Sequence, residues 1–258
     1  MLSTDDYQTH KLVDLIATDP VFTKELLHMV NSSGAGFQTN SVRHVVAILG
    51  KDTLKSFAVA LNLRIYMGDV VRHQTLAKVW RHSLATAILS ELLTESCPGL
   101  YAEPGEEAAY VAGLLHKVGA LGLMVANPPK YAEAIAIATE RGVDLRDVEQ
   151  SLFEIDHCQA GRWIALKWRF SPAIARLASD GRPPVSRKEF KPADLVKVAG
   201  LFADSLGYEV VPMRPALTFN EVRAMLPDMA QDKFAWTDSQ LKLKVDERMS
   251  TLMEGKQC

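Results

Sequence analysis

The sequence lacks the features that mark secreted, membrane-spanning or zinc-ribbon proteins. It has only three cysteines in 258 residues, Cys97, Cys158 and Cys258, and none of them form a CxxC motif. This pattern argues against a disulfide framework and fits a reducing cytosol. No basic segment followed by an apolar run opens the chain, and no charge-free run approaches the roughly 18 apolar residues of a membrane span. We therefore expect a cytoplasmic protein that does not enter a membrane.

A strong charge of either sign is also missing, since the formal net charge is −2. Proteins that coat nucleic acids or membrane surfaces are usually basic. The segment Val42–Leu61 reads as two helices joined at Gly50, which is loosely like a helix-turn-helix. Ordinary helix packing explains this pair better, because amphipathic helix pairs are common. We therefore do not expect nucleic-acid binding.

Strict alternation of apolar and polar residues is almost absent, so little or no β-sheet is expected. Helix-capping residues instead precede apolar residues at helical spacing. Asp144 is such a cap, and Asp156 with Gln159 has the spacing of a capping box. The segment 107–126 is apolar nearly all round, which predicts one helix buried on every side. The pattern as a whole predicts an all-α fold with one continuous core.

Two tryptophans fall in the helix that follows Asp156, and we expect their environments to differ. Trp163 lies with Ile164 and Ala160 on the side predicted to be apolar, whereas Trp168 closes the helix. A fully buried Trp163 would cost about 3–5 kcal/mol on replacement with alanine. A much smaller loss would place Trp163 at the surface, where it could contact a partner.

Three histidines carry the possible chemistry: His82, His116 and His157. A neutral imidazole is a good ligand for zinc, iron and other transition metals. Two helix-borne histidines with carboxylates could therefore build a phosphohydrolase metal centre. The simpler interpretation is that each is a hydrogen-bonded histidine of the core or a helix cap. No carboxylate stands beside His116, and this favours the simpler interpretation.

At these histidines the chain resembles the HDOD family, the HD-related output domains. The resemblance spans roughly residues 8–205, and the usual first helix of the domain looks short or missing. It is carried by the order and spacing of five runs, which are Leu26-Leu27-His28-Met29-Val30-Asn31-Ser32, Ser41-Val42-Arg43-His44-Val45-Val46-Ala47-Ile48-Leu49-Gly50, Trp80-Arg81-His82-Ser83-Leu84-Ala85, Gly113-Leu114-Leu115-His116-Lys117-Val118-Gly119 and Ile155-Asp156-His157-Cys158-Gln159-Ala160-Gly161.

The resemblance implies an all-α, multi-helix HD-like bundle with an N-terminal helical lobe. We expect an HDOD-like domain over residues 1–205, with its N-terminal lobe at about 8–75 and its HD-like lobe at about 76–205. Residues 206–258 are expected to form a C-terminal helical extension packed on that domain.

HD phosphohydrolases, to which this family is similar, hold metal on a His…His-Asp…Asp set. Carried onto this chain, His82 and His116 remain, but Lys117 stands in place of the aspartate of the His-Asp pair. A later His-His pair falls near Ala178-Ser179, and the final aspartate falls near Ala199-Gly200. A protonated lysine has no lone pair for a metal and repels a divalent cation. The resemblance thus implies a pseudo-enzyme with no cofactor.

The implied function is a non-catalytic bacterial signal-transduction or regulatory module that acts through contacts with signalling proteins or by sensing a small anion. The alternative is a degenerate metal-dependent phosphohydrolase of the HD type. The candidate residues form a vestigial pocket of His82, His116, Lys117, Asp156 and His157.

Lys117 lies in the most apolar segment of the chain, so its ammonium needs a partner or access to solvent. In one interpretation it reaches solvent or pairs with a carboxylate such as Asp156 or Asp180. In the other, it joins His82 and His116 in a cationic pocket for a phosphate or nucleotide ligand, which is bound and not cleaved.

Overall fold

A computed structural model describes most of the C-terminal three-quarters of the chain. The described residues are 74–98, 100, 107–167, 170, 172–177, 179, 189–211 and 216–254, together with Ser41, Val42 and Val46. The chain divides into two compact units, one formed by Met1–Tyr66 with Glu247–Cys258 and the other by Met67–Asp246. Most of the expected N-terminal lobe, including the helix pair around Gly50, lies outside the described residues. The expected lobe boundaries stay a prediction.

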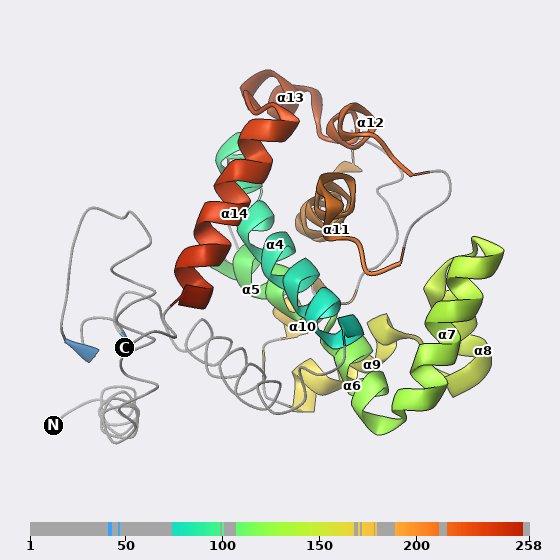
Figure 1. Ribbon diagram of the computed structural model, residues 1–258. Coiled ribbons are helices and arrows are strands. Elements are labelled where there is room, and N and C mark those ends of the chain that lie inside the picture. The colour runs from blue at the N-terminus through green and yellow to red at the C-terminus, as the bar shows by residue number, and fades with distance from the viewer. Residues whose placement is uncertain are drawn as a thin grey trace, which may run out of the picture. The chain divides into compact units, whose positions relative to one another are not determined.

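The described residues form helices and no strand, which confirms the all-α prediction. Figure 1 labels the helices of this part of the chain. The helices are α4 (Gln74–Ser96), α5 (Glu107–Leu115), α6 (Val118–Ala126), α7 (Pro128–Arg141), α8 (Leu145–Phe153), α9 (His157–Lys167), α10 (Pro172–Leu177), α11 (Pro192–Ala203), a π-helical turn η2 (Asp204–Tyr208), α12 (Phe219–Arg223), α13 (Asp228–Lys233) and α14 (Asp238–Glu254).

Helix α4 is the centre of the larger unit and packs against both α5 and α11. Its middle turns are buried on nearly every side, and Ala85, Ala87, Ile88 and Leu89 have no exposed surface. Such complete burial is typical of a central helix enclosed by its neighbours. His82 lies at the start of this buried stretch, so the fold places its imidazole inside the core.

The segment 107–126 is two helices, so the prediction of one continuous helix was wrong. Helix α5 ends at Leu115, a turn at His116 and Lys117 follows, and α6 begins at Val118. Lys117 has φ −108° and ψ 10°, which lies outside the helical region. The break turns the polar pair away from a purely helical register, so that their side chains reach groups on α4 and α9.

By length and by composition, the stretch Ala109–Ala126 could cross a membrane. In the fold, however, 67% of it is buried by other parts of the chain. A buried core segment meets the same criteria of length and hydropathy as a membrane span. The stretch is therefore weak evidence for a membrane helix.

Helix α6 approaches α9 very closely at Gly119. A Cβ atom at this position would lie 1.9 Å from the carbonyl oxygen of His157 and 2.4 Å from the backbone nitrogen of Gly161. Only glycine permits such contact, because any side chain would overlap the backbone of α9. The contact brings Lys117, two residues before Gly119, beside the first residue of α9.

The helix ends follow the predicted capping signals. The Asp144 side chain accepts a hydrogen bond from the Arg146 backbone at 2.9 Å. The Asp156 side chain accepts one from the Gln159 backbone at 2.7 Å. Helix α7 ends at Gly142, which has φ 64° and so adopts the left-handed conformation that glycine favours. Helix α13 carries no comparable side-chain cap, and the sequence interpretation missed it.

Trp163 lies on the outer side of α9, so its predicted place on the apolar side was wrong. Its side chain is 62% exposed, whereas Ala160, Gly161 and Ala165 form the buried side of the helix. Small residues face the core here because α6 comes so close. The large indole is therefore on the opposite side of α9.

Replacing Trp163 with alanine is expected to lower the free energy of unfolding by less than about 1 kcal/mol, since exposed side chains contribute little to stability. Urea unfolding followed by circular dichroism measures this loss. A loss of about 3 kcal/mol or more would mean that the indole is buried in solution.

Candidate functional site

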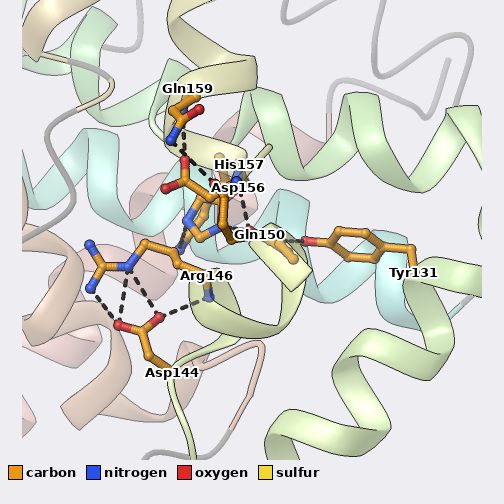
Figure 2. Close-up of polar contacts among 9 residues, drawn as sticks. Tyr131, Asp144, Arg146, Gln150, Asp156, His157 and Gln159 are labelled. Carbon is orange, nitrogen blue, oxygen red and sulfur yellow. Dashed lines mark hydrogen bonds and ion pairs between the residues drawn. The ribbon is translucent and has the colours of Figure 1, made fainter. Parts of the chain in front are cut away.

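Four side chains from three helices and a turn form a continuous line of hydrogen bonds. Nζ of Lys117 lies 3.0 Å from Nε2 of His157. Nδ1 of His157 lies 2.6 Å from Oε2 of Glu149, and the Tyr131 hydroxyl donates to Oε1 of Glu149 at 2.7 Å. In Figure 2 the Tyr131 side chain extends from α7 with its hydroxyl toward the group that contains His157, and Tyr131 is the end of this line opposite Lys117. We call these four residues the buried relay.

Glu149 anchors the buried relay, because it has no exposed surface and accepts three hydrogen bonds. The third comes from the backbone nitrogen of His157 at 2.8 Å, so the carboxylate also caps the start of α9. Burial by itself raises the pKa of Glu149, but the hydrogen bonds and charge of His157 outweigh burial, and the pKa is lowered. Glu149 is therefore an ionised carboxylate inside the protein.

The proton arrangement at His157 follows from its two neighbours. A carboxylate can only accept, so Nδ1 of His157 carries the proton that faces Glu149. Nε2 then carries the lone pair of the ring, and the Lys117 ammonium donates a hydrogen bond to it. Burial and Lys117 lower the pKa of His157, while hydrogen bonds with Cys158 and Glu149 raise it, and the net direction is upward. If Nε2 of His157 were also protonated, its N–H would face the N–H groups of the Lys117 ammonium.

His82 and His116 form a second cluster, with their ring centroids 5.0 Å apart. Nδ1 of His82 lies 3.2 Å from the Tyr208 carbonyl oxygen, and Nδ1 of His116 lies 2.6 Å from the Gly113 carbonyl oxygen. Carbonyl oxygens only accept, so both Nδ1 atoms carry protons. Among the described residues, Nε2 of His116 has no partner and is left as a buried lone pair.

Both of these imidazoles are neutral at physiological pH. Burial and the positive charge of Lys117 together lower the pKa of His82 to about 3, although the hydrogen bond to the Tyr208 carbonyl oxygen raises it. Burial, together with His82 and Lys117, takes the pKa of His116 well below its ordinary value. The cluster therefore offers two uncharged rings and one ammonium, not three cations.

Asp204 is a functional candidate that the sequence interpretation missed. Asp204 begins the π-helical turn η2 that follows α11, and its Oδ1 lies 3.4 Å from Nδ1 of His82. The last family carboxylate had been expected near Ala199-Gly200, and Asp204 follows Gly200 by four residues. Residues four apart lie on the same side of a helix, so a search one turn further along would have found it.

Asp204 lies in a setting that favours its neutral form. Burial outweighs the positive charge of Lys117, which lowers the pKa of Asp204, and together with the negative charge of Glu209 it raises that pKa to about 7. The folded pKa thus stands above the ordinary aspartate value. Such a group stabilises the fold while it is protonated, and this contribution is lost as pH rises from about 4 toward 7.

Asp204→Asn is therefore expected to raise stability relative to the unchanged protein at about pH 8, with a smaller relative gain at about pH 5. The asparagine keeps the shape of the side chain but cannot ionise. Urea unfolding of both proteins at the two pH values measures the difference. Asp232→Asn, at an exposed position on α13, is the control. An equal effect of Asp204→Asn at both pH values would contradict the prediction.

The two clusters do not fit the divalent metal that a resemblance to HD phosphohydrolases implies. Both His82 and His116 donate Nδ1–H to carbonyl oxygens, which leaves each Nε2 able to bind a metal, but Lys117 stands where a ligand carboxylate is expected. An ammonium has no lone pair to give to a metal. Within the described part of the chain, no group of three or more His, Cys, Asp or Glu side chains is placed to share an ion.

The structure pairs four of the five predicted site residues and sets the fifth apart. His82 contacts His116, and Lys117 contacts His157. Asp156 instead caps α9 through Gln159, as Figure 2 shows, and makes no ion pair with Lys117. The other carboxylate proposed for Lys117, Asp180, lies outside the described residues. Sequence interpretation did not find Glu149 and Tyr131, although Glu149 stands eight residues before His157.

Solved structures with similar folds define the class of this domain. A candidate phosphohydrolase from Shewanella amazonensis SB2B is 21% identical with a TM-score of 0.62, and the match covers 95% of this chain and 85% of that one. An HDOD domain protein of unknown function from Geobacter sulfurreducens is 22% identical with a TM-score of 0.57, covering 96% and 84%. The chain thus shares the all-helical fold of these two proteins.

The sequence then places the chain within that class. The HDOD domain profile matches residues 1–181, which is more than half of the chain. The chain belongs to the HDOD family. A candidate signal transduction protein from Marinobacter aquaeolei VT8 also shares the fold, at 19% identity and a TM-score of 0.62 over 100% of this chain and 56% of that one. No curated protein matches the sequence.

Proposed function

We propose that the chain is a non-catalytic regulatory module of bacterial signal transduction, which acts in the cytoplasm through contacts with other proteins. The observation that carries this proposal is the 3.0 Å contact between Nζ of Lys117 and Nε2 of His157. It fixes a cation beside the histidine pair, in the position where the family resemblance expects a ligand carboxylate.

The electrostatics of the site support a structural role for the lysine. A metal phosphohydrolase needs a divalent cation to polarise the phosphate and to activate water. The charge of Lys117 already acts on His82, His116 and Asp204, as their pKa shifts record. A second, divalent charge at this place would be repelled by the ammonium. The lysine thus stabilises the vestigial site without its metal.

The comparisons fit a regulatory role. HDOD means HD-related output domain, and one similar structure is described as a candidate signal transduction protein. The candidate phosphohydrolase among the similar structures keeps the alternative function, an active HD-type hydrolase, as the competing hypothesis. The two functions differ in one measurable property, which is metal-dependent turnover.

We favour protein contacts over sensing of a small anion. An anion site gains affinity from several converging cations or N–H donors. Here the pKa values of both His82 and His116 are lowered, and Asp204 adds a carboxyl group that becomes negative at high pH. Calorimetric titration with phosphate and cyclic dinucleotides tests this choice. Tight binding that is lost in Lys117→Ala would favour the anion sensor instead.

The purified protein, supplied with manganese or iron, is expected to show no hydrolysis of bis(p-nitrophenyl) phosphate or cyclic dinucleotides. The reason is that Lys117 replaces a ligand and repels the metal. His116→Ala serves as the matched background, and Glu140→Ala, at an exposed position on α7, serves as the surface control. Turnover that disappears in His116→Ala but persists in Glu140→Ala would overturn the proposal.

A further inference from the structure

The outer side of α9 carries an exposed surface that the buried relay does not use. Four neighbouring side chains on this side are exposed: Arg162, Trp163, Leu166 and Lys167. The exposed fraction of Leu166 is 43%. The residues lie at positions i, i+1, i+4 and i+5, so they share one side of the helix. We call these four residues the α9 face.

The folding of this domain does not require an indole on the α9 face. The buried side of the same helix is made of Ala160, Gly161 and Ala165, and α6 covers that side. Exposed tryptophan is uncommon on a surface that has no partner, and tryptophan is enriched where protein interfaces have their strongest contacts. Leu166, one turn from Trp163, extends the apolar area on the same side.

The charge of the α9 face indicates what it binds. Helix α9 contains no acidic residue, and the exposed Arg162 and Lys167 flank the two apolar side chains. Nζ of Lys167 lies 5.4 Å from the centroid of the Trp163 ring, within range of a cation–π contact. Acidic groups on a partner would complement these cations and speed its association.

We propose that the α9 face docks an acidic segment of a partner protein that also carries apolar side chains. A second copy of this chain fits less well, because a two-fold interface would bring Arg162 and Lys167 against their own copies. A lipid surface also fits less well. An interfacial helix inserts a continuous apolar side, whereas α9 has only 11 residues and its small-residue side is already packed on α6.

This proposal goes beyond the regulatory function and needs no assumption about catalysis. The α9 face and the Lys117 site are made of different side chains. A positive hydrolysis assay would therefore overturn the proposed function and leave the docking surface intact, and a failed binding assay would do the opposite.

The test uses the full chain and a fluorescent peptide composed of alternating acidic and leucine-rich turns, with a second peptide in which glutamine replaces every acid. Fluorescence anisotropy is expected to detect binding of the acidic peptide only. The dissociation constant should rise by about tenfold or more in Trp163→Ala and in the double variant Arg162→Glu/Lys167→Glu, and binding should weaken as salt increases. Met229→Ala, at an exposed apolar position on α13, is the control and should bind normally.

Equal binding by all variants, or no binding of the acidic peptide, would overturn the proposal. Two further measurements separate the other occupants. Sedimentation that shows dimers lost in Trp163→Ala would mean that a second copy covers the α9 face. Binding to vesicles of phosphatidylserine and phosphatidylcholine, lost in the same variant, would mean that a lipid surface does, and either result overturns the acidic partner. Because Trp163 is exposed, its alanine variant is expected to remain folded, which thermal unfolding checks.

Discussion

Glu149→Ala is expected to lower the free energy of unfolding by about 3–5 kcal/mol, because it removes a buried carboxylate on which three hydrogen bonds converge. The carboxylate has no exposed surface and accepts from the His157 backbone, the His157 ring and the Tyr131 hydroxyl. Alanine would leave these three donors without a partner and open a cavity among them. Since Tyr131 is on α7, Glu149 on α8 and His157 on α9, the loss would loosen all three helices.

Chemical unfolding in urea at pH 7 measures this loss, with Glu140→Ala as the control at an exposed site of α7. Glu149→Gln should cost less than alanine, because its carbonyl oxygen still accepts, although its amide group faces the remaining donors. A loss below about 1 kcal/mol for alanine would show that water reaches Glu149 and replaces its partners.

The pH dependence of this loss has a definite sign. The folded pKa of Glu149 lies below its ordinary value, so its stabilising contribution is present above the unfolded pKa. It is lost as pH falls through the folded pKa. The difference between the unchanged protein and Glu149→Ala should therefore shrink in acid. A difference that grows in acid would contradict an ionised Glu149.

Helix ends were the part of the fold that the sequence predicted best, because caps act locally. Asp144, Asp156 and Gly142 satisfy or terminate backbone groups within three or four residues of themselves, so their pattern is readable without a tertiary structure. Thr237 and Gln240 before α14 show the same local pattern. The Gln240 side chain accepts from the Thr237 backbone N–H, and the Thr237 hydroxyl accepts from the Gln240 backbone N–H.

Interactions between helices were the part that sequence reasoning could not supply. Lys117, at the break between α5 and α6, contacts His157, forty residues later in the chain. Trp163 was assigned to the wrong side because the close approach of Gly119 puts the small residues of α9 inward. The partners of His82, which are Tyr208 and Asp204, come from a π-helical turn that no periodicity indicates.

Gly119→Ala is expected to destabilise the protein by at least about 3 kcal/mol, beyond the usual range for overpacking. The added Cβ would lie 1.9 Å from the His157 carbonyl oxygen and 2.4 Å from the Gly161 nitrogen. These are backbone atoms, so no side-chain rotation relieves the overlap and α6 must move away from α9. That movement would also separate Lys117 from His157 and so break the buried relay at that contact.

Two other glycines at the same helix pair provide matched controls. A Cβ at Gly161 would meet its nearest neighbour, the Gly119 nitrogen, at 3.4 Å, so Gly161→Ala should be neutral or gain up to about 1 kcal/mol from helix propensity. A Cβ at Gly122 would lie 2.8 Å from Cδ1 of Ile164, the end of a flexible side chain, so Gly122→Ala should fall between the other two. Urea unfolding of the three variants should rank Gly119→Ala as the least stable and Gly161→Ala as the most stable. If Gly119→Ala were as stable as Gly161→Ala, α6 and α9 would not be in contact at Gly119. That result would also contradict the position of Lys117 beside His157.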